Sequence, residues 1–96
     1  MYLSIGKTAV VPEDSVIGIF DLDTSTQSFL TREFLAAAEK GRAVTNAAED
    51  IPNAFILCGE KGGSRVYLSQ ITSRTLSKRM NQLEEERRTT WRKSMI

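Results

Sequence analysis

The residues of this 96-residue chain that could do chemistry are cations close to the start of a predicted C-terminal helix. Arg74 and Lys78 are one helical turn apart and Arg79 follows, while Arg65 and Lys7 are outlying members of the same set. Cations in the first turns of a helix oppose its dipole by roughly 0.3 to 1 kcal/mol each, so their presence suggests another benefit, such as phosphate binding. We predict these five side chains as DNA-binding residues. The plainer interpretation, an ordinary solvated helix face, stays open beside it.

The charge of the chain is unevenly distributed along the sequence. Residues 1–60 carry four basic and nine acidic side chains, a net charge of −5, whereas residues 61–96 carry nine basic and three acidic ones, a net charge of +6. Such a separation is typical of a polyanion-binding surface, and equally of subunits that associate acidic face to basic face.

Residue types that support other chemistry are scarce. The chain has no histidine and one cysteine, Cys58, which lies inside an apolar run and is interpreted as a small core residue. Asp21 and Asp23 lack the further oxygen ligands and the glycine of a calcium loop, so a loop leading into a helix is favoured. The Gly-Lys-Thr run at residues 6–8 lacks the earlier glycine of a P-loop. We therefore predict no enzyme, no metal site and no cofactor.

A central hairpin is the strongest structural prediction. Residues 54–58 form an unbroken apolar run of strand length, residues 59–64 form a glycine-rich connection, and residues 65–71 alternate between apolar and polar side chains. A connection of six residues is too short for a parallel crossover, so the two strands should be antiparallel.

The elements before this hairpin are predicted from shorter signals. Residues 2–5 and 8–11 should form a small hairpin, and residues 16–20 and 42–45 two further strands. The apolar spacing over residues 28–40 predicts a helix that Phe34 and Leu35 anchor to the sheet.

A second helix is predicted after the hairpin, with Leu76, Met80 and Leu83 on one apolar stripe that packs on the core. We divide the chain into a domain, residues 1–83, and a charged tail, residues 84–96, whose last half-dozen residues should fray unless a partner holds Trp91. The fold class is α+β, a small antiparallel sheet of about five or six strands with two helices. No apolar run approaches the ~18 residues of a membrane span, and no secretory signal is present, so we expect a cytoplasmic protein.

Four stretches carry a resemblance to a known family. Residues 1–6, 10–11, 16–21 and 31–35 resemble the RemA and RemB regulators of extracellular-matrix genes, with the RemB type the closer match. The resemblance runs from Tyr2 to about Met80. It implies a cytoplasmic bacterial transcription regulator of biofilm genes that binds double-stranded DNA as a homo-oligomer. It also implies a closed ring of subunits, for which an octamer is one expected size.

The sequence departs from that family pattern at the positions where arginines are expected. RemA-like chains have arginines in the loop before the strand at residues 55–58 and in the turn before the strand at residues 16–20. Here those places hold Ile51, Pro52 and Ser15. The alternative prediction is therefore an oligomeric protein-interaction or scaffold subunit that does not bind DNA directly.

Overall fold

The antiparallel hairpin predicted from the sequence is formed by β5 (Ala54–Glu60) and β6 (Gly63–Ser69). The predicted six-residue connection is wrong, because the ladder continues up to Glu60 and Gly63 and leaves only Lys61 and Gly62 to turn the chain. Gly62 and Gly63 have φ angles of 91° and 155°, which glycine adopts readily, so the strands stay paired up to the turn.

The computed structural model describes residues 1–25 and 27–95, with side chains up to residue 88. The elements around the hairpin are, in chain order, β1 (Tyr2–Ser4), β2 (Val10–Pro12), the 3₁₀ turn η1 (Glu13–Ser15), β3 (Val16–Asp21), α1 (Leu22–Ser25), α2 (Phe29–Lys40), β4 (Val44–Asn46) and, after β6, α3 (Ser73–Met95).

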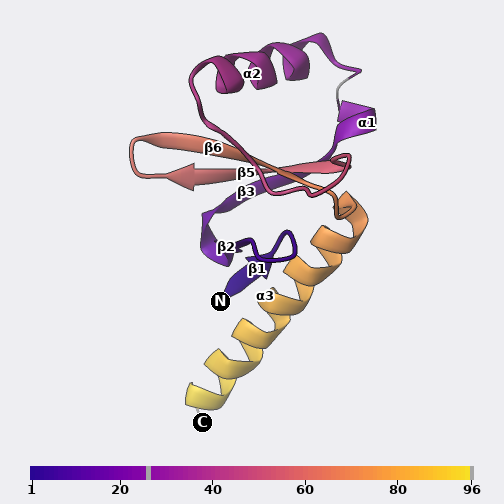
Figure 1. Ribbon diagram of the computed structural model, residues 1–96. Helices are drawn as coiled ribbons and strands as arrows, with labels where there is room; N and C mark the ends of the chain where they lie inside the picture. Colours follow the sequence, from indigo (N-terminus) through magenta and orange to yellow (C-terminus); the bar gives the residue numbers. More distant parts are fainter. Residues whose placement is uncertain (26, 96) are drawn as a thin grey trace.

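The strands form two sheets, whereas the sequence predicted one. The larger sheet has the order β3-β5-β6-β4, and β1 pairs only with β2. The α+β class is confirmed, but the prediction of a purely antiparallel sheet is wrong because β4 pairs with β6 in parallel. Since β3 and β4 consequently run in the same direction, the chain between them must cross the sheet. That crossover carries α1 and α2 over one face (Figure 1).

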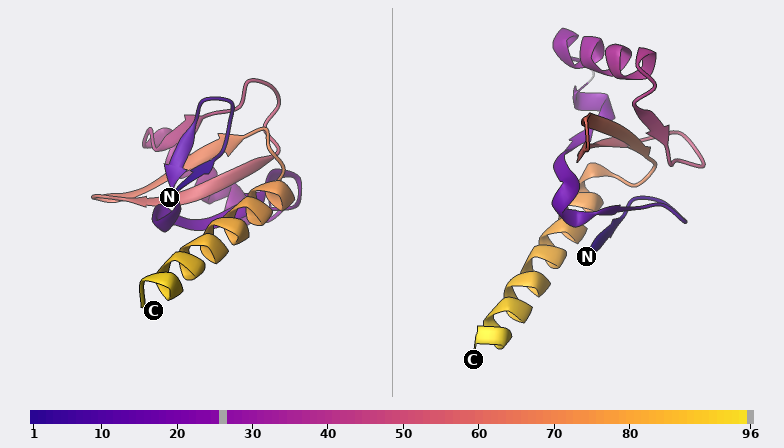
Figure 2. Two further views of the ribbon diagram at one scale, coloured as in Figure 1. Left: turned by 90° about the horizontal axis from the view of Figure 1, so that it is seen from below. Right: turned by 90° about the vertical axis from the view of Figure 1, so that its left-hand side faces the viewer.

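The opposite face of the larger sheet is covered by the β1–β2 hairpin and α3 (Figures 1 and 2). The core lies between these layers and consists of buried apolar side chains: Leu3, Ile5, Val11, Ala54, Ile56, Cys58 and Leu76. Met80 and Leu83 pack against it, which confirms the predicted apolar stripe of α3. Cys58 is 2% exposed, which confirms that it is a core residue.

A buried hydroxyl group joins the two sheets. Ser69, at the end of β6, is fully buried, and its Oγ donates to the carbonyl of Ile5 at 2.6 Å while accepting from the amide of Ile71 at 3.0 Å. Backbone groups that neither ladder satisfies are therefore paired through one side chain.

Helix α2 differs from its prediction, because none of its residues is buried. Leu35 is half-buried, but the other predicted anchor, Phe34, is 41% exposed, and Phe29 and Leu30 are 63% and 73% exposed. Phe20 of β3 stacks on Phe55 of β5 beneath the helix, with ring centroids 4.8 Å apart. Apolar periodicity identified the apolar side of this helix but not how closely the sheet approaches it.

Two further helical segments differ from the predictions. The expected loop at residues 21–26 contains the one-turn helix α1, capped by Asp21, whose Oδ1 accepts from the amide of Thr24 at 3.0 Å. Helix α3 runs without a break through the predicted domain boundary at residue 83 and continues to Met95, whereas its last residues were predicted to fray. Within residues 1–25 and 27–95, no helix has the length and apolarity to span a membrane.

Candidate nucleic-acid interface

Two of the predicted DNA-binding residues, Arg74 and Lys78, lie on the first turns of α3 and are exposed. Neither side chain has an ion pair or hydrogen bond with another residue in the part of the chain whose side chains are described. The helix begins after Thr72, whose Oγ1 accepts from the amide of Thr75 at 3.3 Å. The first N–H groups of α3 and two cations that no described side chain pairs therefore occupy the same end of the helix, an arrangement that favours an anion.

Arg79 has a structural contact instead. Its Nη1 donates to the carbonyl of Ser4 at 3.1 Å, which joins α3 to β1, and its side chain is only partly exposed. The β1–β2 turn that carries Lys7 begins after Ser4, and Lys7 is exposed. The β1–β2 hairpin, which carries Lys7, lies on the same side of the larger sheet as α3, which carries Arg74, Lys78 and Arg79 (Figure 2).

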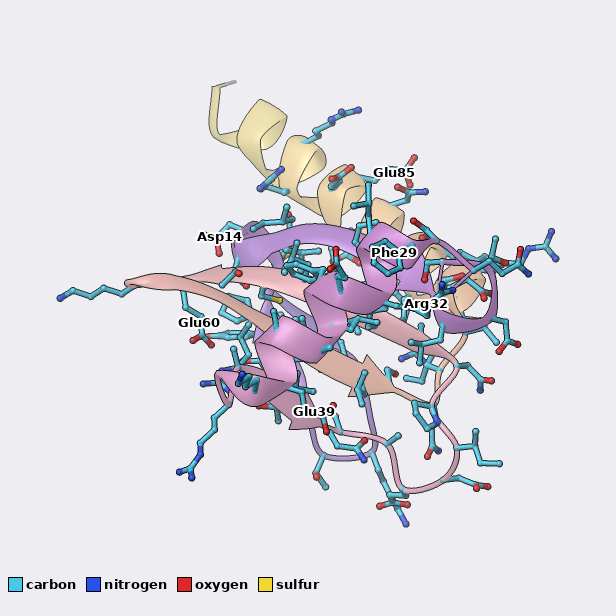
Figure 3. The ribbon with its side chains drawn as sticks, turned by 90° about the horizontal axis from the view of Figure 1, so that it is seen from above. Asp14, Phe29, Arg32, Glu39, Glu60 and Glu85 are labelled. Atoms are coloured by element: carbon cyan, nitrogen blue, oxygen red, sulfur yellow. The ribbon has the colours of Figure 1, made fainter. Side chains whose placement is uncertain are left out.

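The fifth predicted residue, Arg65, is not brought together with the others. Its Nε forms an ion pair with Glu60 at 3.2 Å and its Nη1 donates to Oγ1 of Thr45 at 3.1 Å. Glu60 lies near the tip of the β5–β6 hairpin (Figure 3), whereas α3 begins beyond the other end of β6. Because its charge is offset by Glu60, Arg65 is poorly suited to hold a phosphate.

The carboxylate of Glu60 also accepts from the hydroxyl of Tyr67 at 3.2 Å. The pKa of Tyr67 is raised, mainly by burial and to a smaller extent by this hydrogen bond. Burial likewise raises the pKa of the Cys58 thiol, which keeps it protonated and unreactive near neutral pH. Glu60, Arg65, Tyr67 and Thr45 therefore form a structural cluster that connects β4, β5 and β6.

Farther along α3, an ion pair that was not predicted joins the helix to η1. Glu13 of η1 is 3% exposed, and its Oε1 lies 3.0 Å from Nη1 of Arg87. The angles do not meet those of a hydrogen bond, so charge attraction is the main contribution. The run of three glutamates after Leu83 separates this cation from Arg74 and Lys78.

Other kinds of site receive no support from the geometry. Among the residues with described side chains, no group of three or more His, Cys, Asp or Glu could hold a metal ion. Asp21, which with Asp23 forms the acidic pair before α2, acts as a helix cap.

No protein-family model matches the chain, and no curated protein matches it significantly.

Proposed function

We propose that this protein is a DNA-binding transcriptional regulator of extracellular-matrix genes, similar to the RemA and RemB regulators, which acts in the cytoplasm as a homo-oligomer. The observation that carries the proposal is a pair of exposed cations at the beginning of a long helix, Arg74 and Lys78, neither of which has a partner among the described side chains. Lys7 on the same face adds a third positive charge.

The mode of binding follows from how few cations each subunit offers. Two or three phosphate contacts bind weakly alone, but subunits linked in an oligomer, such as the ring implied by the family resemblance, combine many weak contacts. Phosphates carry no sequence information, so selection among DNA sites would depend on the shape of the duplex.

The proposal is tested by measuring duplex binding over a range of salt concentrations. Each phosphate contact contributes about −0.9 to the slope of log K against log salt concentration. Replacing Arg74 by Ala should reduce the magnitude of the slope by about 0.9 for every subunit that touches DNA. The affinity loss should therefore exceed that of a single contact.

A matched control removes the same charge elsewhere. Lys61 is exposed in the turn of the β5–β6 hairpin, at the other end of the sheet, so Lys61→Ala should leave both affinity and slope close to those of the unaltered protein. Equal behaviour of Arg74→Ala and Lys61→Ala, or a slope near zero for the unaltered protein, would contradict the proposal.

A second function is supported by a different observation. Phe29, Leu30 and Phe34 leave an apolar surface on α2, and Ile51, which stands where the family has an arginine, is 78% exposed. These features suit an oligomeric protein-interaction or scaffold subunit. A gel-shift titration with A·T-rich and mixed duplexes separates the two functions, since the scaffold would retain neither.

A further inference from the structure

A groove lined by apolar side chains separates α2 from the sheet. It has a volume of about 250 Å³ and is lined by Phe20, Leu30, Thr31, Phe34, Phe55 and Leu57. Binding sites for drug-sized molecules are roughly 300–1,000 Å³, so this groove is better suited to one large apolar side chain. An aromatic ring would find the stacked pair of Phe20 and Phe55 as its floor.

The end of α3 projects beyond the body of the protein. Among the residues whose side chains are described, Leu83 is the last on α3 to pack on the core and Arg87 is the last to form an ion pair, with Glu13 of η1. The helix nevertheless continues to Met95. Residues 88–95 add about 12 Å of helix at 1.5 Å per residue. This extension makes the molecule 49 Å long against 28 and 25 Å in its other dimensions (Figure 1).

The projecting segment, residues 88–95, which we name the α3 tail, has two apolar residues in an otherwise polar sequence. Trp91 and Met95 are four positions apart, the spacing of neighbours on one helix face. Trp91 is the only tryptophan of the chain.

We infer that the α3 tail of one copy of this protein docks in the α2 groove of a second copy, with Trp91 as the residue that enters it. A tail cannot reach the groove of its own copy. The groove lies on the α2 face of the sheet, whereas α3 leaves from the opposite face and runs away from it (Figures 1 and 2).

The charges of the two surfaces are complementary. Residues 16–40, which contain β3 and α2, have four acidic and two basic side chains, whereas residues 88–95 have three basic and no acidic ones. Attraction between opposite charges at the rim of an interface favours this pairing over tail-to-tail contact. The acidic first part and basic last part of the chain thus acquire a common explanation.

The contact is head-to-tail, because tail and groove are different surfaces. Repetition of such a contact closes into a ring when the rotation between neighbours allows it. This inference names the interface between subunits of the oligomer in the proposed function. The interface itself does not depend on DNA binding; only the purpose of the assembly rests on the proposed function. It extends past Met80, where the family resemblance ends.

The single tryptophan allows a direct test. Raising the concentration of the unaltered protein should shift Trp91 fluorescence to shorter wavelength as the mass measured by sedimentation rises above 10.7 kDa. Trp91→Ala and Phe34→Asp should both remain monomers. Val10→Asp, which places the same charge on an apolar residue of β2 that is 58% exposed and outside the groove, should associate like the unaltered protein.

Mixing the two monomeric variants separates a head-to-tail contact from a symmetric one. Trp91→Ala retains the groove and Phe34→Asp retains the tail, so their mixture should form a pair of twice the chain mass. The only tryptophan in that pair belongs to the intact tail, and its emission should shift. A mixture that stays monomeric, an unaltered protein whose emission is independent of concentration, or full association of Phe34→Asp would overturn the inference.

Duplex binding by the same variants keeps the two proposals distinguishable. Association of the expected kind without retention of any duplex would support the interface and refute the regulator function. Duplex binding by a protein that is monomeric at every concentration would support DNA binding and refute the interface.

Discussion

The hydroxyl of Ser69 joins the two sheets through hydrogen bonds to the backbone. Replacing Ser69 by Ala removes this partner from the carbonyl of Ile5, which is buried, and from the amide of Ile71, which is part-buried. An unsatisfied buried polar group costs about 1–3 kcal/mol, so the free energy of unfolding in urea should fall by at least about that amount. Ser64→Ala, on the exposed part of the same strand, is the matched control and should change stability little. Equal stability of the two variants would contradict this role.

At the scale of an element, the position of α3 depends on its ion pair with η1 as well as on its apolar stripe. Arg87→Ala leaves the carboxylate of Glu13 buried without its cation, at a cost of about 1–3 kcal/mol in unfolding free energy. Glu13→Gln in that background should recover part of the loss, because a neutral amide is easier to bury. Arg88→Ala, next to it and without an ion pair to any described side chain, should stay within about 0.5 kcal/mol of the unaltered protein. Additive losses in the double variant would show that the two side chains do not interact.

At the scale of the whole molecule, the separation of charge should govern how copies associate. Salt shortens the range of electrostatic attraction to about 3 Å at 1 M, whereas burial of Trp91 in the groove does not depend on charge. Sedimentation at increasing salt should therefore show association that weakens but persists. Complete dissociation would mean that charge alone holds the copies together, and unchanged affinity would mean that the charges of the tail and the groove take no part.

Several features of the protein were predictable from the sequence by itself. Patterns of a few neighbouring residues predict the β5–β6 hairpin, the burial of Cys58 and the apolar stripe of Leu76, Met80 and Leu83. The exposure of Arg74 and Lys78 also follows from their spacing relative to that stripe. Periodicity determines such features because each depends on neighbours along the chain.

The remaining features were decided only by the tertiary structure. The parallel pairing of β4, the gap beneath α2 and the burial of Glu13 depend on how distant segments meet. The same holds for the cations, since Arg79 is engaged by Ser4, 75 residues earlier, and Arg65 by Thr45 across two strands. No local pattern contains these contacts. A cation with a partner and one without look alike in sequence, and only the packed structure distinguishes them.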